Sequence, residues 1–163
     1  MMITESLQLF GHDIYMSAKP TKTNLEIFLG FMERNNVESI VPLMPIQDIY
    51  QFYGYDLIEV YEDSNLNVIH YPIDDYDVPQ DFKTFDYFLN EIGEALQQSS
   101  VLIHCSAGLG RTGLVTAALL IKYKEYGAKH AIDAVRKSRY GTVETLEQEM
   151  FLAKYDYYIN GAQ

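Results

Sequence analysis

One stretch of the sequence constrains the fold more than any other: residues 101–113, which read VLIHCSAGLGRTG. Its first four residues, 101–104, form an apolar run that is typical of a buried strand. The only cysteine of the chain, Cys105, comes next, and small residues and glycines then lead to Arg111. We therefore expect a strand that delivers a cysteine into a tight loop, followed directly by a helix that begins at or near Gly110.

The sequence on either side alternates between strand patterns and helix patterns, which is typical of an α/β fold. We expect a central, mostly parallel sheet of about four to five strands with helices on both faces. No repeat or linker-like segment interrupts the chain, so we expect one domain over residues 1–163. Strand patterns cover 13–17, 37–43, 67–73 and 101–104; helix patterns cover 25–35, 81–97, 113–126, 129–138 and 144–159, with one or two more helices between 45 and 66.

Composition narrows the functional classes. A hydrophobic content of 48% over 163 residues is enough for a sizeable core. The net charge of −11 opposes binding to nucleic acid or to an anionic membrane. No leader-like segment or stretch of 18 apolar residues is present, and a lone cysteine fits a reducing compartment, so we expect a cytoplasmic protein. One cysteine and four scattered histidines do not suggest a metal site.

The loop after the central strand has the composition of an anion-binding nest. None of its residues between Cys105 and Arg111 is charged, and its glycines permit positive φ, so successive backbone N–H groups can point inward. The helix that follows adds the positive end of its dipole at the same place. The residues that we expect to surround the anion are Ser106, Ala107, Gly108, Leu109 and Gly110.

The arginine and the cysteine give this loop its chemistry. The planar fork of Arg111 suits two oxygens of a phosphate group at once. The same positive surroundings favour the thiolate form of Cys105, which is the nucleophilic form. A nucleotide-binding P-loop does not fit, because GLGRTG lacks both its spacing and its lysine. We therefore expect phosphoryl-transfer chemistry at a cysteine.

The segment HCSAGLGRTG resembles the signature of the cysteine-dependent protein tyrosine phosphatase superfamily, and most of all its small dual-specificity branch. Two further segments, 71–80 and 136–148, are similar to the family's general-acid loop and to the segment that closes its catalytic core. Residues 1–66 match only in the order of elements. The resemblance implies a protein tyrosine phosphatase-like fold in a single catalytic domain.

It also implies the reaction: hydrolysis of phosphomonoesters through a phosphocysteine intermediate, without a metal or other cofactor. The implied substrates are phosphorylated proteins or peptides, with phosphotyrosine as the main target and phosphoserine or phosphothreonine as additional targets, and we expect a monomer. Cys105 would attack phosphorus, Arg111 would hold the equatorial oxygens, and the Thr112 hydroxyl would stabilise the leaving thiolate. His104 would orient the loop from behind.

Three aspartates compete for the role of general acid. In the resembling branch the acid follows a proline by three positions, as Asp75 follows Pro72, so we favour Asp75 over Asp74 and Asp77. Near the C-terminus, Gln148 matches a glutamine that can position the hydrolytic water. A solvated helical glutamine is an equally good interpretation of Gln148 from the sequence alone.

Two other hypotheses use the same residues. The first is a phosphatase-like protein that binds phosphorylated partners without turning them over. The second is the same reaction on a non-protein substrate, such as an RNA 5′ end or a phosphorylated sugar or lipid. The charge disfavours RNA and the loop lacks lysines found in phosphoinositide phosphatases, although a basic rim could still form from Lys19, Lys22, Arg136, Lys137 and Arg139. No tyrosine-recognition loop like that of the large tyrosine-specific enzymes is visible, which suggests a shallow pocket.

Overall fold

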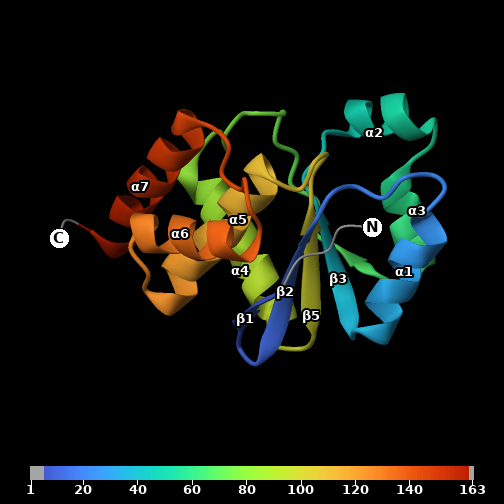
Figure 1. Ribbon diagram of the computed structural model, residues 1–163, viewed down its shortest axis with the longest axis horizontal. Helices are drawn as coiled ribbons and strands as arrows, with labels where there is room; N and C mark the ends of the chain where they lie inside the picture. Colours follow the sequence, from blue (N-terminus) through green and yellow to red (C-terminus); the bar gives the residue numbers. More distant parts are fainter. Residues whose placement is uncertain (1–5, 162–163) are drawn as a thin grey trace.

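A computed structural model describes residues 6–161 and shows one sheet with helices around it (Figure 1). The strands are Leu7–Leu9 (β1), His12–Ser17 (β2), Val37–Pro42 (β3), Asn67–Val68 (β4) and Ser100–His104 (β5). They lie side by side in the order β1-β2-β5-β3-β4. Only β1 runs antiparallel to its neighbour; the other pairs are parallel. The prediction of a mostly parallel sheet of four to five strands is confirmed.

Parallel pairing brings the ends of three strands to one edge of the sheet. Ser17 of β2 and Pro42 of β3 both pair in register with His104, the last residue of β5. The segments that follow these strands therefore leave the sheet together. Open α/β sheets bind ligands outside the carboxyl ends of their strands. Cys105 is the first residue beyond this edge, as the sequence predicts.

Helices cover both faces of the sheet, which confirms the expected arrangement. Figure 1 shows α1, α2 and α3 on one side and α4 to α7 on the other. Within residues 6–161, no helix is long and apolar enough to cross a membrane. The helices span Leu25–Arg34 (α1), Ile46–Tyr53 (α2), Leu57–Asp63 (α3), Phe82–Leu96 (α4), Gly110–Lys124 (α5), Ala128–Ser138 (α6) and Leu146–Asn160 (α7).

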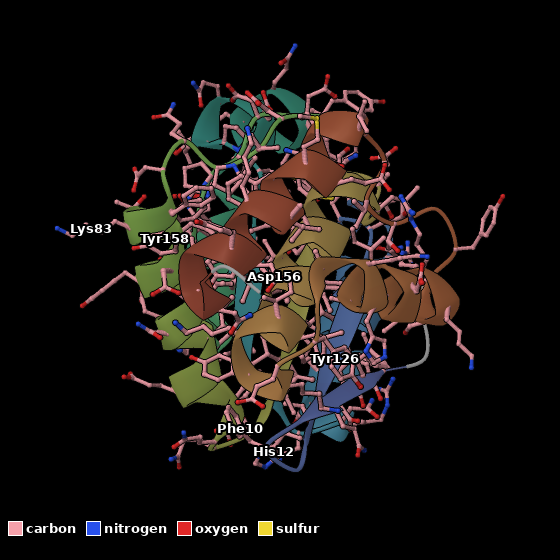
Figure 2. The ribbon with its side chains drawn as sticks, turned by 90° about the vertical axis from the view of Figure 1, so that its left-hand side faces the viewer. Phe10, His12, Lys83, Tyr126, Asp156 and Tyr158 are labelled. Carbon is pink, nitrogen blue, oxygen red and sulfur yellow. The ribbon has the colours of Figure 1, made fainter. Side chains whose placement is uncertain are left out.

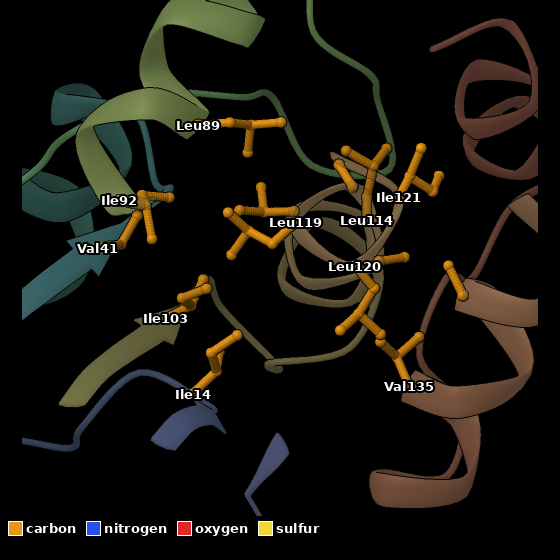
Figure 3. Close-up of a cluster of buried hydrophobic side chains, with 14 of the residues drawn as sticks. Ile14, Val41, Leu89, Ile92, Ile103, Leu114, Leu119, Leu120, Ile121 and Val135 are labelled. Atoms are coloured by element: carbon orange, nitrogen blue, oxygen red, sulfur yellow. The ribbon is translucent and has the colours of Figure 1, made fainter. Parts of the chain in front are cut away.

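The strand and the helix that flank the cysteine loop are the most deeply buried elements. All five residues of β5 are buried, because it is central in the sheet and covered on both faces. Helix α5 is buried from Gly110 through Ile121, as its nearly all-apolar sequence predicts. Figure 3 shows its leucines packed between side chains of the sheet, of α4 and of α6. The loop is thus held between two rigid elements.

Helix α4 packs through the apolar face that its sequence pattern predicts, and α7 lies against it (Figure 2). Phe82 of α4 stacks on Tyr158 of α7 with ring centroids 5.2 Å apart. Asp86 of α4 accepts hydrogen bonds of 2.6 Å from both Lys122 of α5 and Tyr155 of α7. The Asp86 carboxylate therefore links α4, α5 and α7, which cover the same face of the sheet.

Two strands differ from the sequence prediction. Strand β1 is missing from it; β1 joins β2 through a tight hairpin in which Phe10 and Gly11 both have positive φ, 56° and 80°. The strand predicted over 67–73 is paired only at β4, because beyond it the chain makes isolated bonds to the sheet, such as Ile73 N to Leu43 O at 2.9 Å. The segment 45–66 contains two helices, within the range that we expected.

Candidate active site

The cysteine loop, residues 105–109, is fixed to the segments that follow β2 and β3. Leu43 N donates to His104 O at 2.9 Å, and Lys19 N donates to Ser106 O at 3.0 Å. Cys105 itself is only 2% exposed. The start of the loop is therefore hydrogen-bonded on one side to the segment after β2 and on the other to the segment after β3.

Gly108 is the loop position that only glycine can occupy. Its φ is +74°, and a Cβ there would lie 2.3 Å from the backbone carbon and oxygen of Ser17. Gly110, which we also expected to supply positive φ, instead begins helix α5. It is still confined, because a Cβ at Gly110 would lie 2.5 Å from Glu144 Oε1. Gly108 thus permits the turn of the loop, and Gly110 leaves room for the Glu144 side chain beside the start of α5.

Three successive carbonyl groups of the loop are hydrogen-bonded from outside it. Ser106 O accepts from Lys19 N, while the Arg139 guanidinium donates to Ala107 O at 3.1 Å and to Gly108 O at 2.8 Å. In a trans peptide the N–H points opposite to the C=O of the same unit. The N–H groups that follow these carbonyls consequently point toward the inside of the loop, which is the arrangement of an anion-binding nest.

The position of Arg139 corrects the sequence analysis. We considered it as part of a basic rim, but its side chain is 4% exposed and lies behind the loop. Burial lowers the pKa of Arg139 from its usual value, and the neighbouring Cys105 acts in the opposite direction. Arg136 is also engaged, since it donates to the carbonyls of Thr142 and Val143.

Arg111 is buried at the first turn of α5, with part of its hydrogen-bonding capacity used by the protein. Its Nη1 donates to Ile73 O at 2.8 Å, and its Nη2 lies 3.1 Å from Asp75 Oδ1. The third nitrogen group, Nε, has no hydrogen-bond partner among the described residues. A buried charged donor without a partner is costly, so the guanidinium is well suited to an oxyanion ligand.

Of the three aspartates that compete for the role of general acid, Asp75 is the one that the structure pairs with Arg111. Its side chain is 52% exposed, so it can also face a ligand. Asp75 Oδ1 also accepts from Tyr76 N at 3.0 Å, as Asp77 Oδ1 does from Val78 N at 2.8 Å, whereas Asp74 and Asp77 line a separate hollow. Asp75 is thus the aspartate of the three that lies beside the cysteine loop, and its role as the acid stays a prediction.

Thr112 and Cys105 contact each other as the expected roles require. Thr112 Oγ1 lies 3.1 Å from Cys105 Sγ and donates a hydrogen bond to it. Both residues are buried, with Thr112 fully inaccessible to solvent. A hydroxyl donor at this distance can stabilise a thiolate.

The side chain of His104 contacts the backbone of the loop from behind. Its Nδ1 lies 3.0 Å from Cys105 O, which can only accept, so Nδ1 carries the hydrogen. The other nitrogen, Nε2, then accepts from the Tyr61 hydroxyl at 2.9 Å. Complete burial lowers the pKa of His104 to about 4, despite the opposing effect of the Cys105 bond, so the ring is neutral at physiological pH.

The sequence analysis missed the hydroxyl partner of His104. Tyr61 is fully buried in α3, and burial raises its pKa well above the usual value. It belongs to a run of aromatic residues that fits neither the helix period nor the strand period. No sequence signal therefore distinguished Tyr61 from the other tyrosines of that run.

Gln148 lies in the first turn of α7 and faces the start of α5 and the segment that contains Asp77. Thr145 N donates to Gln148 Oε1 at 3.2 Å and Gln148 N donates to Thr145 Oγ1 at 3.0 Å, which forms a capping box at the start of α7. Gln148 Oε1 also accepts from Glu144 N at 2.8 Å. Its Nε2 donates to Asp77 O at 3.3 Å. Gln148 is fully buried, so the interpretation of a solvated helical glutamine is wrong.

A cavity of about 340 Å³ opens beside the cysteine loop. One side is formed by the loop and by Asp75, and the other by α2, which the sequence analysis did not assign to the site. Lys19 bridges the two sides, because its Nζ donates to Ser106 Oγ at 2.7 Å and lies 4.4 Å from the centroid of the Phe52 ring. The lining residues are Lys19, Met44, Asp48, Gln51, Phe52, Asp75, Ser106 and Arg111. Within residues 6–161, no cluster of three or more His, Cys, Asp or Glu side chains could hold a metal ion.

Comparisons with known proteins find similar sequences among phosphatases. Residues 14–157 match a family model described as dual specificity phosphatase, catalytic domain. The chain is 24% identical over 140 residues to cyclin-dependent kinase inhibitor 3 of Rattus norvegicus, which covers 84% of this chain and 66% of that protein. It is 41% identical over 81 residues to the tyrosine-protein phosphatase non-receptor type ptp-2 of Caenorhabditis elegans, covering 44% of this chain and 12% of the relative. The chain thus spans less than two thirds of either curated relative.

Solved structures show the same fold. The active form of Tk-PTP superimposes with a TM-score of 0.78 at 29% identity, covering 94% of this chain and 98% of that one. The kinase associated phosphatase with its catalytic cysteine replaced by serine superimposes with a TM-score of 0.82 at 21% identity, covering 94% and 90%.

Proposed function

Because this chain belongs to the dual specificity phosphatase catalytic-domain family, we propose that it hydrolyses phosphomonoesters on proteins or peptides, with Cys105 as the nucleophile. The single observation that carries this proposal is the arrangement of Arg111. Its guanidinium is buried, its Nε has no partner among the described residues, and Arg111 is the second residue of α5, which begins where the cysteine loop ends. A buried guanidinium whose Nε–H has no partner among the described residues, beside a nest of N–H groups, can bind a phosphate dianion.

In the first step, the Cys105 thiolate attacks phosphorus, an S–P bond forms and the P–O ester bond breaks. The Asp75 carboxyl group gives its proton to the leaving oxygen, so that an alcohol rather than an alkoxide departs. Arg111 and the inward N–H groups stabilise the charge on the three equatorial oxygens throughout. For this step Asp75 must release Arg111, to which it is paired at 3.1 Å.

In the second step, water attacks the phosphocysteine, the S–P bond breaks and inorganic phosphate leaves. Asp75, now ionised, takes the proton of the water. The Thr112 hydroxyl, 3.1 Å from Sγ, stabilises the thiolate that is regenerated. Gln148 contacts the acid-bearing segment through Asp77 O and is the residue that we assign to positioning the water.

We assign the reaction to a monomer without a metal or other cofactor. One chain supplies the nucleophile, the anion-binding groups and the acid, so the proposed steps need no metal ion and no second copy of the chain. A cytoplasmic location fits a cysteine nucleophile, which must remain reduced to react.

The test is phosphate release from an aryl phosphate in the presence of a chelator. Wild-type protein should turn over, Cys105→Ser should lower kcat by about 10⁴-fold or more, and Arg111→Lys should lower kcat/KM strongly. Thermal unfolding of each variant checks that the fold is retained. Undiminished turnover by Cys105→Ser would show that the nucleophile is wrong. Tight binding of a phosphopeptide without phosphate release would favour the binding protein instead.

A further inference from the structure

The outer wall of the active-site cavity comes from helix α2. Three residues of α2 line the cavity: Asp48, Gln51 and Phe52. Gln51 and Phe52 follow Asp48 by three and four positions, so each lies next to Asp48 on one side of the helix. Figure 1 shows α2 at the same edge of the sheet as the segment that joins β5 to α5.

The Phe52 ring is held beside the phosphate-binding loop by a cation. Lys19 Nζ is 4.4 Å from the ring centroid and 2.7 Å from Ser106 Oγ. Since both contacts meet at one nitrogen, the centroid lies within about 7 Å of Ser106 Oγ. Tyr53 packs edge-on against Phe52, with centroids 4.8 Å apart. Phe52 nevertheless remains 45% exposed, which leaves part of the ring open to a ligand.

We infer that Phe52 is a specificity-determining residue that selects phosphotyrosine over phosphoserine and phosphothreonine; this inference rests on the proposed function. In phosphotyrosine the ester oxygen is bonded directly to an aromatic ring. With the phosphate in the loop, that ring would extend into the cavity that Phe52, Ser106 and Arg111 line, where it could pack against Phe52. In phosphoserine one carbon separates the ester oxygen from the backbone, so polar peptide groups would face the apolar ring and lose water without gaining partners.

Lys19 supports this selection because it holds the Phe52 ring in a fixed position beside the loop. Its ammonium group contacts the loop that binds the phosphate and the ring that contacts the substrate side chain. The contribution of an aromatic pair beyond the area that it buries corresponds to about two- to ten-fold in kcat/KM.

The experiment compares two peptides of identical sequence, one with phosphotyrosine and one with phosphoserine. Phosphate release gives kcat/KM for wild type, Phe52→Ala and Phe52→Leu; the leucine keeps apolar volume and removes the aromatic face. The matched control is Tyr50→Ala, which removes an exposed aromatic side chain of the same helix that does not line the cavity. We expect wild type to prefer phosphotyrosine, and both Phe52 variants to lose about two- to ten-fold in kcat/KM with that peptide alone.

Two results would overturn the inference: an equal fall with both peptides in the Phe52 variants, or a wild-type preference for phosphoserine. A fall in Tyr50→Ala as large as that in Phe52→Ala would also do so. Failure of the proposed function looks different, because wild type would then release no phosphate from either peptide or from the aryl phosphate.

Discussion

Replacing Arg139 with methionine tests whether the loop is shaped from behind. The substitution keeps a long side chain but removes the donors to Ala107 O at 3.1 Å and Gly108 O at 2.8 Å. A hydrogen bond to a charged group contributes about 1.5–3 kcal/mol, so losing two costs roughly 3 kcal/mol after the loop relaxes. Because the lost bonds orient the inward N–H groups, we expect kcat/KM to fall by about 10²-fold.

Steady-state hydrolysis of an aryl phosphate measures this loss, and urea unfolding measures the accompanying loss of stability. Lys137→Met is the matched control, since it removes the same charge from the same end of α6 at an exposed position. Arg139→Lys should recover only part of the activity, because one ammonium group lacks the planar fork of arginine. The reasoning fails if Arg139→Met and Lys137→Met lower kcat/KM equally.

Three further perturbations probe other contacts of the site. Thr112→Val should slow the second step and produce a burst of released alcohol in rapid-mixing experiments; an unchanged steady state without a burst would contradict its role. Because the pKa of His104 is about 4 in the folded protein and 6.5 in the unfolded chain, stability should be complete above pH 6.5 and fall by about 3 kcal/mol as the pH drops to 4. Urea unfolding at several pH values measures this fall, and a His104→Gln variant that loses as much would refute the assignment. Gly108→Ala should abolish activity, whereas Gly11→Ala, with a similar φ of +80° but nothing within 4 Å, should remain active; equal activity of the two would contradict the fit of Gly108 against Ser17.

The part of the site that is contiguous in the sequence could be predicted from it. Strand β5, the loop and the start of α5 follow one another, so local patterns alone place Cys105, Arg111 and Thr112. The preference for Asp75 relied on the spacing from Pro72 in the resembling family, and the structure places its carboxylate 3.1 Å from Arg111 Nη2.

The parts built by tertiary packing could not be predicted. Helices α2 and α3 have only eight and seven residues and each buries only two, so neither shows a clear period. Their contributions, Phe52 and Tyr61, consequently had no signal. Arg139 was equally ambiguous, because a sequence does not distinguish an arginine on a rim from one that binds loop carbonyls behind it.

Nucleophilic attack by Cys105 is tested directly by identifying the residue that becomes phosphorylated during turnover. Wild-type protein mixed with an aryl phosphate in chelator is quenched in acid, digested and analysed by mass spectrometry. The account predicts a phosphoryl group on Cys105, present in larger amount in Thr112→Val, whose second step is slowed. A phosphoryl group on another side chain, or steady turnover with no phosphorylated protein in either form, would contradict it.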